Sequence, residues 1–313
     1  MTTRHVAGTG LLAVTLALGL LPKTAWAVNG ITYVSARSAE SSNPTRFVEA
    51  KCPTGTRAIG GSAVIAGPSS IVVNSAAPTE TPATASSPLK TSFEVFASEP
   101  AGGIADTWYV VANVICAPSG QLPGLEYREQ FSSYDSTAVH TATVSCSAGN
   151  KLIGVGGVVD SNGPGQDRLV LTAIVPADDL TSLIVQGHES EAGYDSNWRV
   201  KAIAVCARPL PGQQLIRASS ANDAIDHKLA RAACPSGTLI HSVGFDLRNG
   251  AGQVHATRFF PDVDLNNNPN VQGVEVQAQE DANGFLTITR LGIDGPVVTN
   301  NKWFVSALGI CAR

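Results

Sequence analysis

The sequence predicts an all-β protein built from three tandem repeats, each closed by a disulfide. A nine-residue segment that begins with Trp and ends with Cys occurs three times, at residues 108–116, 198–206 and 303–311. β-branched and apolar runs, broken by Gly, Pro, Asn and Ser, fill the chain after residue 27, and none keeps a helical period. A fixed spacing that recurs in this way indicates a repeat architecture.

The first 27 residues have the pattern of an export signal. Arg4 and His5 precede an apolar run over residues 6–21, and Ala25-Trp26-Ala27 forms a small-x-small cleavage site. The run is shorter than the ~20 residues that a membrane-spanning helix needs. We therefore expect cleavage after Ala27 and a secreted, extracellular or periplasmic protein without stable membrane insertion.

The six Cys fall into one pair per repeat. The pairs are Cys52/Cys116, Cys146/Cys206 and Cys234/Cys311. Six Cys allow 15 pairings, but a repeat that folds as a unit favours pairing within itself, and an oxidising compartment favours disulfides. Each loop would stabilise the fold by roughly 4 kcal/mol in the chain-entropy model. A thiolate metal site is disfavoured because the nearest Cys are 28 residues apart.

About five short strands are expected in each repeat. They are a segment before the first Cys (46–51, 140–145, 228–233), a Gly-rich strand after it, a strand that ends at a Pro, a strand that ends at a Glu, and the Trp-to-Cys strand. Pro ends the third strand because it lacks a donor for the ladder. The repeats are expected to span residues 28–120, 121–212 and 213–313.

Alternation in the Trp-to-Cys strand places Trp and Cys on the same face. This assigns Trp108, Trp198 and Trp303 a structural role on a buried face. The outer face is polar in repeat 2, where Arg199 and Lys201 lie, and apolar in the other two repeats.

Three acids at equivalent positions are candidate ligand-binding residues. They are Glu99, Glu189 and Glu280, each at the end of an otherwise apolar strand face. Such an acid could bind a ligand or cation. The favoured interpretation is structural: the carboxylate accepts a hydrogen bond from a Trp indole or from turn amides, because buried acids need partners.

Two Asp/Asn-rich loops are a further candidate. Asp160, Asn162 and Asp167 lie in the first loop, and residues 262–268 form the second. Their oxygens suit Ca²⁺, but neither loop matches an established calcium loop and repeat 1 lacks the pattern. Solvated turns are therefore favoured, and no metal or cofactor is predicted.

Catalysis and nucleic-acid binding are both disfavoured. The mature chain's His residues show no close-spaced pair, no Gly-x-Ser-x-Gly elbow or phosphate-binding loop occurs, and the disulfides leave no thiol. A net charge of -4 with few aromatic residues gives no basic surface for nucleic acid. A catalytic triad from distant segments stays open as an alternative.

The repeat resembles a known pattern. The order Cys-Pro-x-Gly, Ile-Gly-Gly, an apolar strand ending in Pro, Trp-x-Val and Cys-Ala is similar to a repeat of secreted bacterial proteins of unknown function. Residues 154–167 more weakly resemble the vitelline membrane outer layer protein I type of β-prism. That resemblance implies a sugar-associated or coat role without catalytic residues. The repeats are thus expected to be β-sandwich or β-prism-like.

The function expected from these features is non-catalytic binding at a surface, with glycans or cell-envelope material as ligand and a protein partner as another option. Repeats multiply weak sites into avidity. One alternative is a structural component of an extracellular complex or coat that docks through Phe304, Leu308 and Ile310. The second alternative is a secreted hydrolase.

Overall fold

The computed structural model describes residues 28–68, 70–79, 90–100, 102–163, 165–250, 252–263, 272–280 and 302–313. The expected export signal lies outside these residues. Repeat 1 holds β1 (Thr32–Arg37), β2 (Thr45–Lys51), β3 (Thr56–Ala66), β4 (Val72–Thr79), β5 (Ser92–Ser98) and β6 (Tyr109–Pro118). Repeat 2 holds β7 (Glu126–Phe131), β8 (Val139–Ser145), β9 (Lys151–Ser161), β10 (Leu169–Pro176), β11 (Ser182–Glu189) and β12 (Trp198–Ala207). Repeat 3 holds β13 (Gln214–Ser219), β14 (His227–Ala233), β15 (Leu239–Arg248), β16 (Val254–Val263), β17 (Gln272–Glu280) and β18 (Phe304–Ala312).

The all-β class and the three disulfide-stapled repeats are confirmed. Disulfides join Cys52 to Cys116, Cys146 to Cys206 and Cys234 to Cys311. Two short 3-10 helices, Ser119–Gln121 and Gln166–Arg168, interrupt the strands. Among the described residues, no helix is long and apolar enough to cross a membrane.

Among the described residues, each repeat has six strands, where about five were expected. The additional strands β1, β7 and β13 pair with the closing strands β6, β12 and β18. They lie at sheet edges and are short and largely exposed or half-buried. Because such a strand has little apolar alternation, its sequence resembles a linker.

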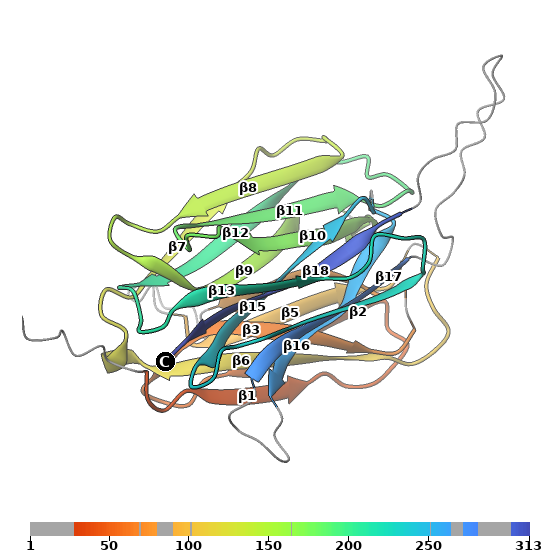
Figure 1. Ribbon diagram of the computed structural model, residues 1–313. Coiled ribbons are helices and arrows are strands. Elements are labelled where there is room, and N and C mark those ends of the chain that lie inside the picture. The colour runs from red at the N-terminus through yellow and green to blue at the C-terminus, as the bar shows by residue number, and fades with distance from the viewer. Residues whose placement is uncertain are drawn as a thin grey trace, which may run out of the picture.

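Every sheet is shared by two repeats. The strand orders are β1-β6-β3-β16-β17-β14, β2-β5-β4-β9-β12-β7 and β13-β18-β15-β10-β11-β8. In Figure 1, the green strands β10 and β11 of repeat 2 accordingly lie in one sheet with β13 and β18 of repeat 3. The repeats exchange strands cyclically and therefore form one pseudo-threefold body.

The junctions between repeats are short. Strand β4 meets β9 only at Ser75 and Ala76, and β10 meets β15 and β16 meets β3 over two residues each. Within a repeat, by contrast, β9 pairs with β12 along its whole length. Strands of different repeats thus pair over only a short length at each boundary.

Strands β3, β9 and β15 approach one another closely near the pseudo-threefold axis. A Cβ on Gly154 would lie 1.4 Å from the carbonyl oxygen of Ile59, and one on Gly60 would lie 2.5 Å from that of His241. Only Gly permits backbones to pack this closely. The Gly residues of the Gly-rich strand are therefore needed where the repeats meet.

Each of these strands also carries a β-bulge at the same repeat position. The bulged residues are Ile59, Ile153 and His241. The carbonyl before each bulge accepts a hydrogen bond from another repeat: Tyr127 Oη to Ala58 (2.9 Å), Gln213 Nε2 to Leu152 (2.6 Å) and Tyr33 Oη to Ile240 (3.0 Å). These contacts join the repeats in a ring.

The inward face of the closing strand is buried as the alternation predicts. Trp108, Trp198 and Trp303 are fully buried, together with the half-cystines Cys116, Cys206 and Cys311. The outer face of β18 is also enclosed, with Leu308 and Ile310 each 1% exposed. These two residues are covered by the chain itself and are not available as a docking surface.

Tyr127→Phe tests the ring of contacts. Because it leaves the buried Ala58 carbonyl without its donor, we expect a loss of about 1–3 kcal/mol in the free energy of unfolding, measured in urea. Tyr134→Phe is the matched control, since this exposed hydroxyl donates to no residue that the structure describes. Equal effects of the two variants would contradict the interpretation.

His241→Ile tests the axial core. Neither His241 ring nitrogen has a hydrogen-bond partner among the described residues, and burial lowers the pKa of this imidazole from 6.5 to about 4. The unfolded chain therefore takes up the proton first as the pH falls below about 6.5. We expect the wild type to lose up to roughly 3 kcal/mol of stability between pH 7 and 4 relative to the variant.

Urea unfolding at several pH values measures this difference. Ile occupies the same bulge in repeats 1 and 2, so the variant keeps an apolar residue of that environment. His227→Gln is the control, because His227 is exposed. A pH profile that His241→Ile leaves unchanged would refute the assignment.

Candidate binding sites at the repeat boundaries

The three repeated acids hold the three repeated Trp. Glu99 Oε1 accepts the Trp108 indole N–H at 2.7 Å, Glu189 that of Trp198 at 3.2 Å, and Glu280 that of Trp303 at 2.8 Å. An indole hydrogen bond, one of the two kinds of partner considered for these acids, is present in every repeat. Turn amides add to it, since the second carboxylate oxygen accepts from Ile104 N in repeat 1 and from Tyr194 N in repeat 2.

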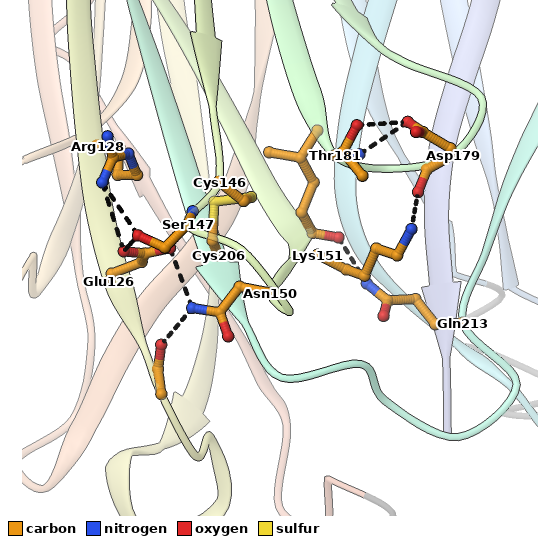
Figure 2. Close-up of a disulfide and its surroundings, with 12 residues drawn as sticks. Glu126, Arg128, Cys146, Ser147, Asn150, Lys151, Asp179, Thr181, Cys206 and Gln213 are labelled. Atoms are coloured by element: carbon orange, nitrogen blue, oxygen red, sulfur yellow. Dashed lines mark hydrogen bonds and ion pairs between the residues drawn. A yellow bond between two sulfur atoms is a disulfide. The ribbon is translucent and has the colours of Figure 1, made fainter.

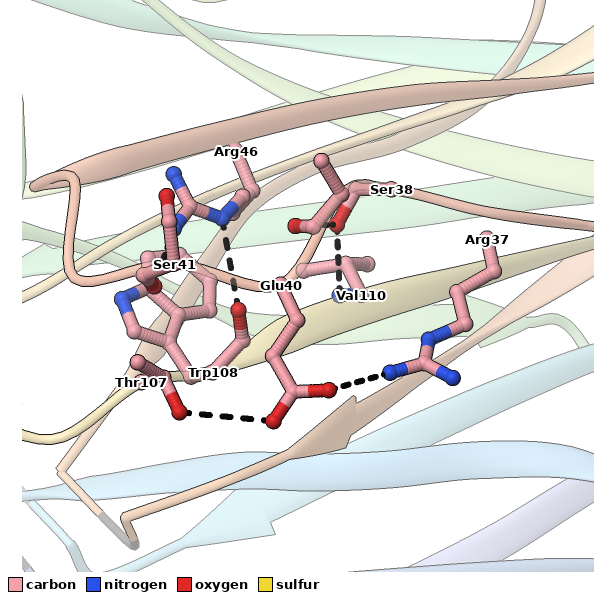
Figure 3. Close-up of polar contacts among 9 residues, drawn as sticks. Arg37, Ser38, Glu40, Ser41, Arg46, Thr107, Trp108 and Val110 are labelled. Carbon is pink, nitrogen blue, oxygen red and sulfur yellow. Dashed lines mark hydrogen bonds and ion pairs between the residues drawn. The ribbon is translucent and has the colours of Figure 1, made fainter.

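A basic side chain covers each Trp ring. Arg46 Cζ lies 4.8 Å from the Trp108 ring centroid and Lys228 Nζ lies 4.9 Å from that of Trp303, as in cation–π pairs. His140 lies edge-on to Trp198, with centroids 4.4 Å apart. Figure 3 shows Arg46 beside Trp108 in repeat 1, where Arg46 Nη2 also donates a hydrogen bond to Ser41 Oγ.

This position was not recognised in the sequence. Arg46, His140 and Lys228 each stand six residues before the first Cys of their repeat. The spacing was a usable signal, but the three residue types differ and so hid a common role. Because all three are buried on Trp, the basic residue, the indole and the acid form a structural cluster that fixes the end of each repeat.

The disulfides lie at the other end of the closing strand. Around Cys146–Cys206, the Glu126 carboxylate accepts hydrogen bonds from Ser147 N at 2.8 Å and Asn150 Nδ2 at 3.0 Å (Figure 2). These bonds tie the turn after Cys146 to β7. The open grooves at the repeat boundaries lie near the Trp end of the closing strands instead.

The first groove lies between repeats 1 and 2 and has a volume of about 390 Å³. Its polar lining comes from the ends of β2 and β5 and from the β9–β10 loop. The polar side chains of this lining are Thr45, Ser98, Glu99, Gln166 and Asp167. Two repeats thus contribute to one groove.

Asn74 fixes the loop that forms one wall of this groove. It is the bulged residue of β4, and its Nδ2 donates to the carbonyls of Gln166 (2.9 Å) and Leu169 (2.8 Å). Its Oδ1 accepts from Ser98 Oγ at 2.8 Å. A side chain of repeat 1 therefore sets the position of Asp167 in repeat 2.

The structure separates the acids and amide of the first predicted loop. Asp160 forms an ion pair with Arg199 at 2.7 Å, and Asn162 is exposed and does not line the groove. Asp167 lines the groove, and its carboxylate has no hydrogen bond or ion pair with a described residue. The groove therefore brings Glu99 and Asp167 together and leaves Asp160 and Asn162 outside.

The calcium hypothesis gains no support from the described residues. No group of three or more His, Cys, Asp or Glu that could hold a metal ion occurs among them. Most of the second predicted loop, residues 264–268, lies outside the part of the chain that the structure describes.

A second groove lies at the next boundary, between repeats 2 and 3, with a volume of about 330 Å³. It lies between β11, the strand of repeat 2 that ends in the repeated acid, and the loop that joins β15 to β16 in repeat 3. Its polar lining includes Thr172, Gln186, His188, Arg248 and Asn249. The two grooves occupy related places but carry different side chains.

No family model matches the sequence, and no curated protein matches it.

Glu99→Ala tests the structural role of the repeated acid. Because it leaves the buried Trp108 N–H and the Ile104 N–H without an acceptor, we expect a loss of about 2–3 kcal/mol in the free energy of unfolding. Glu99→Gln keeps one acceptor oxygen and should lose less. Asp167→Ala, in the same groove, should change stability by less than about 0.5 kcal/mol. Denaturation in urea measures all three, and a neutral Glu99→Ala would contradict the role.

Proposed function

We propose that this chain is a secreted, non-catalytic carbohydrate-binding protein whose primary site is the groove between repeats 1 and 2. The observation that carries the proposal is the Asp167 carboxylate, which lines the groove without a partner among the described residues. A carboxylate is an acceptor with room for several donors. The neighbouring hydroxyl groups of a sugar can supply several such donors.

The groove has the other features that saccharide binding needs. Thr45 offers an exposed hydroxyl group, and glycines at positions 102, 103, 163 and 165 line the groove without side chains that would fill it. The loop that carries Asp167 is held by Asn74 before any ligand arrives. A site held in this way loses little conformational entropy on binding.

Other features of the chain agree with a role outside the cell. Three disulfides are typical of proteins in oxidising compartments. The repeat places a second groove on the same body, and several weak sites on one rigid body raise the total affinity for a polymeric ligand.

Hydrolysis is the main competing function, because the first groove holds two carboxylates from different repeats. A pair of carboxyl groups is the usual equipment for cleaving glycosidic bonds. Both oxygens of Glu99, however, accept hydrogen bonds from Trp108 and Ile104, which favours a structural carboxylate over an acid that donates a proton. Binding is therefore the better proposal.

A glycan array, followed by calorimetry on the best ligand, tests the proposal. We expect Asp167→Asn to raise Kd about tenfold or more, because it removes the charge and one acceptor but keeps the shape. Asp178→Asn is the matched control, since this acid is 88% exposed and pairs with Arg217 away from the groove. No binding to any glycan, or equal binding by the Asp167 variant, would refute the proposal, and release of reducing ends would favour hydrolysis.

A further inference from the structure

The two grooves differ in charge although they occupy related places. Among the described residues, the first groove is lined by the acids Glu99 and Asp167 and by no Lys, Arg or His. The described lining of the second groove includes His188 and Arg248 and no Asp or Glu. We propose that the second groove is a separate binding site for an acidic saccharide, a uronate unit whose carboxylate binds Arg248 and whose hydroxyl binds His188.

Arg248 is prepared for a carboxylate. Its Nε donates to Asp246 Oδ2 at 2.7 Å, while its side chain stays 56% exposed. Asp246 is mostly enclosed, with a side chain 14% exposed, so it orients the guanidinium. The planar guanidinium keeps further N–H donors, which match the two oxygens of a carboxylate.

His188 is prepared for a hydroxyl group. Gln186 Nε2 donates to Thr141 Oγ1 at 3.2 Å, which leaves Gln186 Oε1 to accept from His188 Nε2 at 3.3 Å. The proton is therefore on Nε2, and Nδ1 is the acceptor of the ring. Burial lowers the pKa of His188 below 6.5, so the ring stays neutral and keeps this acceptor at pH 7.

The loop that follows Arg248, the last residue of β15, is pressed against the strand that carries His188. Gly252 has a positive φ of 81°, and a Cβ there would lie 2.1 Å from the carbonyl oxygen of Glu189. Only Gly permits this contact. The backbone contact fixes the spacing between the loop that follows Arg248 in repeat 3 and the His188 strand of repeat 2.

The saccharide part of this inference rests on the proposed function, whereas the preference for an anion rests on the second groove alone. An acidic sugar combines the two required chemistries, because it carries hydroxyl donors next to a carboxylate. A neutral sugar would offer no charged acceptor to the Arg248 N–H groups that Asp246 does not bind.

Calorimetry with trigalacturonic acid and its methyl ester provides the test, because the two probes share a backbone and differ in charge. We expect the acid to bind the full-length mature protein at least tenfold more tightly than the ester. Arg248→Gln should remove this preference, and His188→Phe should weaken both probes. Arg217→Gln, another exposed Arg paired with an Asp, is the matched control and should have no effect.

Equal binding of the acid and the ester, or a preference that survives Arg248→Gln, would overturn the inference. Loss of the preference in Asp167→Asn would also overturn it, since that residue belongs to the first groove. If His188→Phe does not fold, the Arg248 variant alone decides. The proposed function fails separately, when Asp167→Asn leaves neutral-glycan binding unchanged.

Discussion

The close approach of β3, β9 and β15 at the pseudo-threefold axis is the constraint on which the rest of the fold depends. Gly154 and Gly60 let the backbones meet, and the bulges beside them turn Ile59, Ile153 and His241 into the interior. Hydrogen bonds from other repeats then satisfy the carbonyls before the bulges. No repeat can therefore complete its sheets or satisfy these buried polar groups alone.

The grooves follow from the same constraint. Because neighbouring repeats pair over only two residues at each junction, the loops beyond the junction are free of the ladder. Asn74 at one boundary and Gly252 at the next then press a loop of one repeat onto a strand of the other. Loops held at fixed positions on a rigid sheet are well suited to carry binding residues.

The local features were predictable from the sequence, and the long-range ones were not. Alternation gave the buried face of Trp108 and Cys116, and alignment gave the partnership of Glu99 with its Trp, because both depend on spacing within one repeat. The sharing of sheets depends on contacts such as Ser75 with Val158, which leave no local mark in the sequence. Asp160 and Asp167 look equivalent in the sequence. Only a structure shows that Asp160 forms an ion pair with Arg199 and that Asp167 lines a groove.

The residues that recur in every repeat differ from the residues proposed to bind ligands. The residues that recur in every repeat, namely Trp, its Glu partner and the half-cystines, have their polar groups engaged inside the fold. The residues that differ between repeats face the grooves, where Asp167 stands at one boundary and Arg248 at the next. A shared scaffold thus keeps the geometry of each boundary constant while the loops change its charge. Under the proposed function, distinct ligands at related sites are the expected consequence, since the scaffold would fix the position of each site and the residues that differ between repeats would select its ligand.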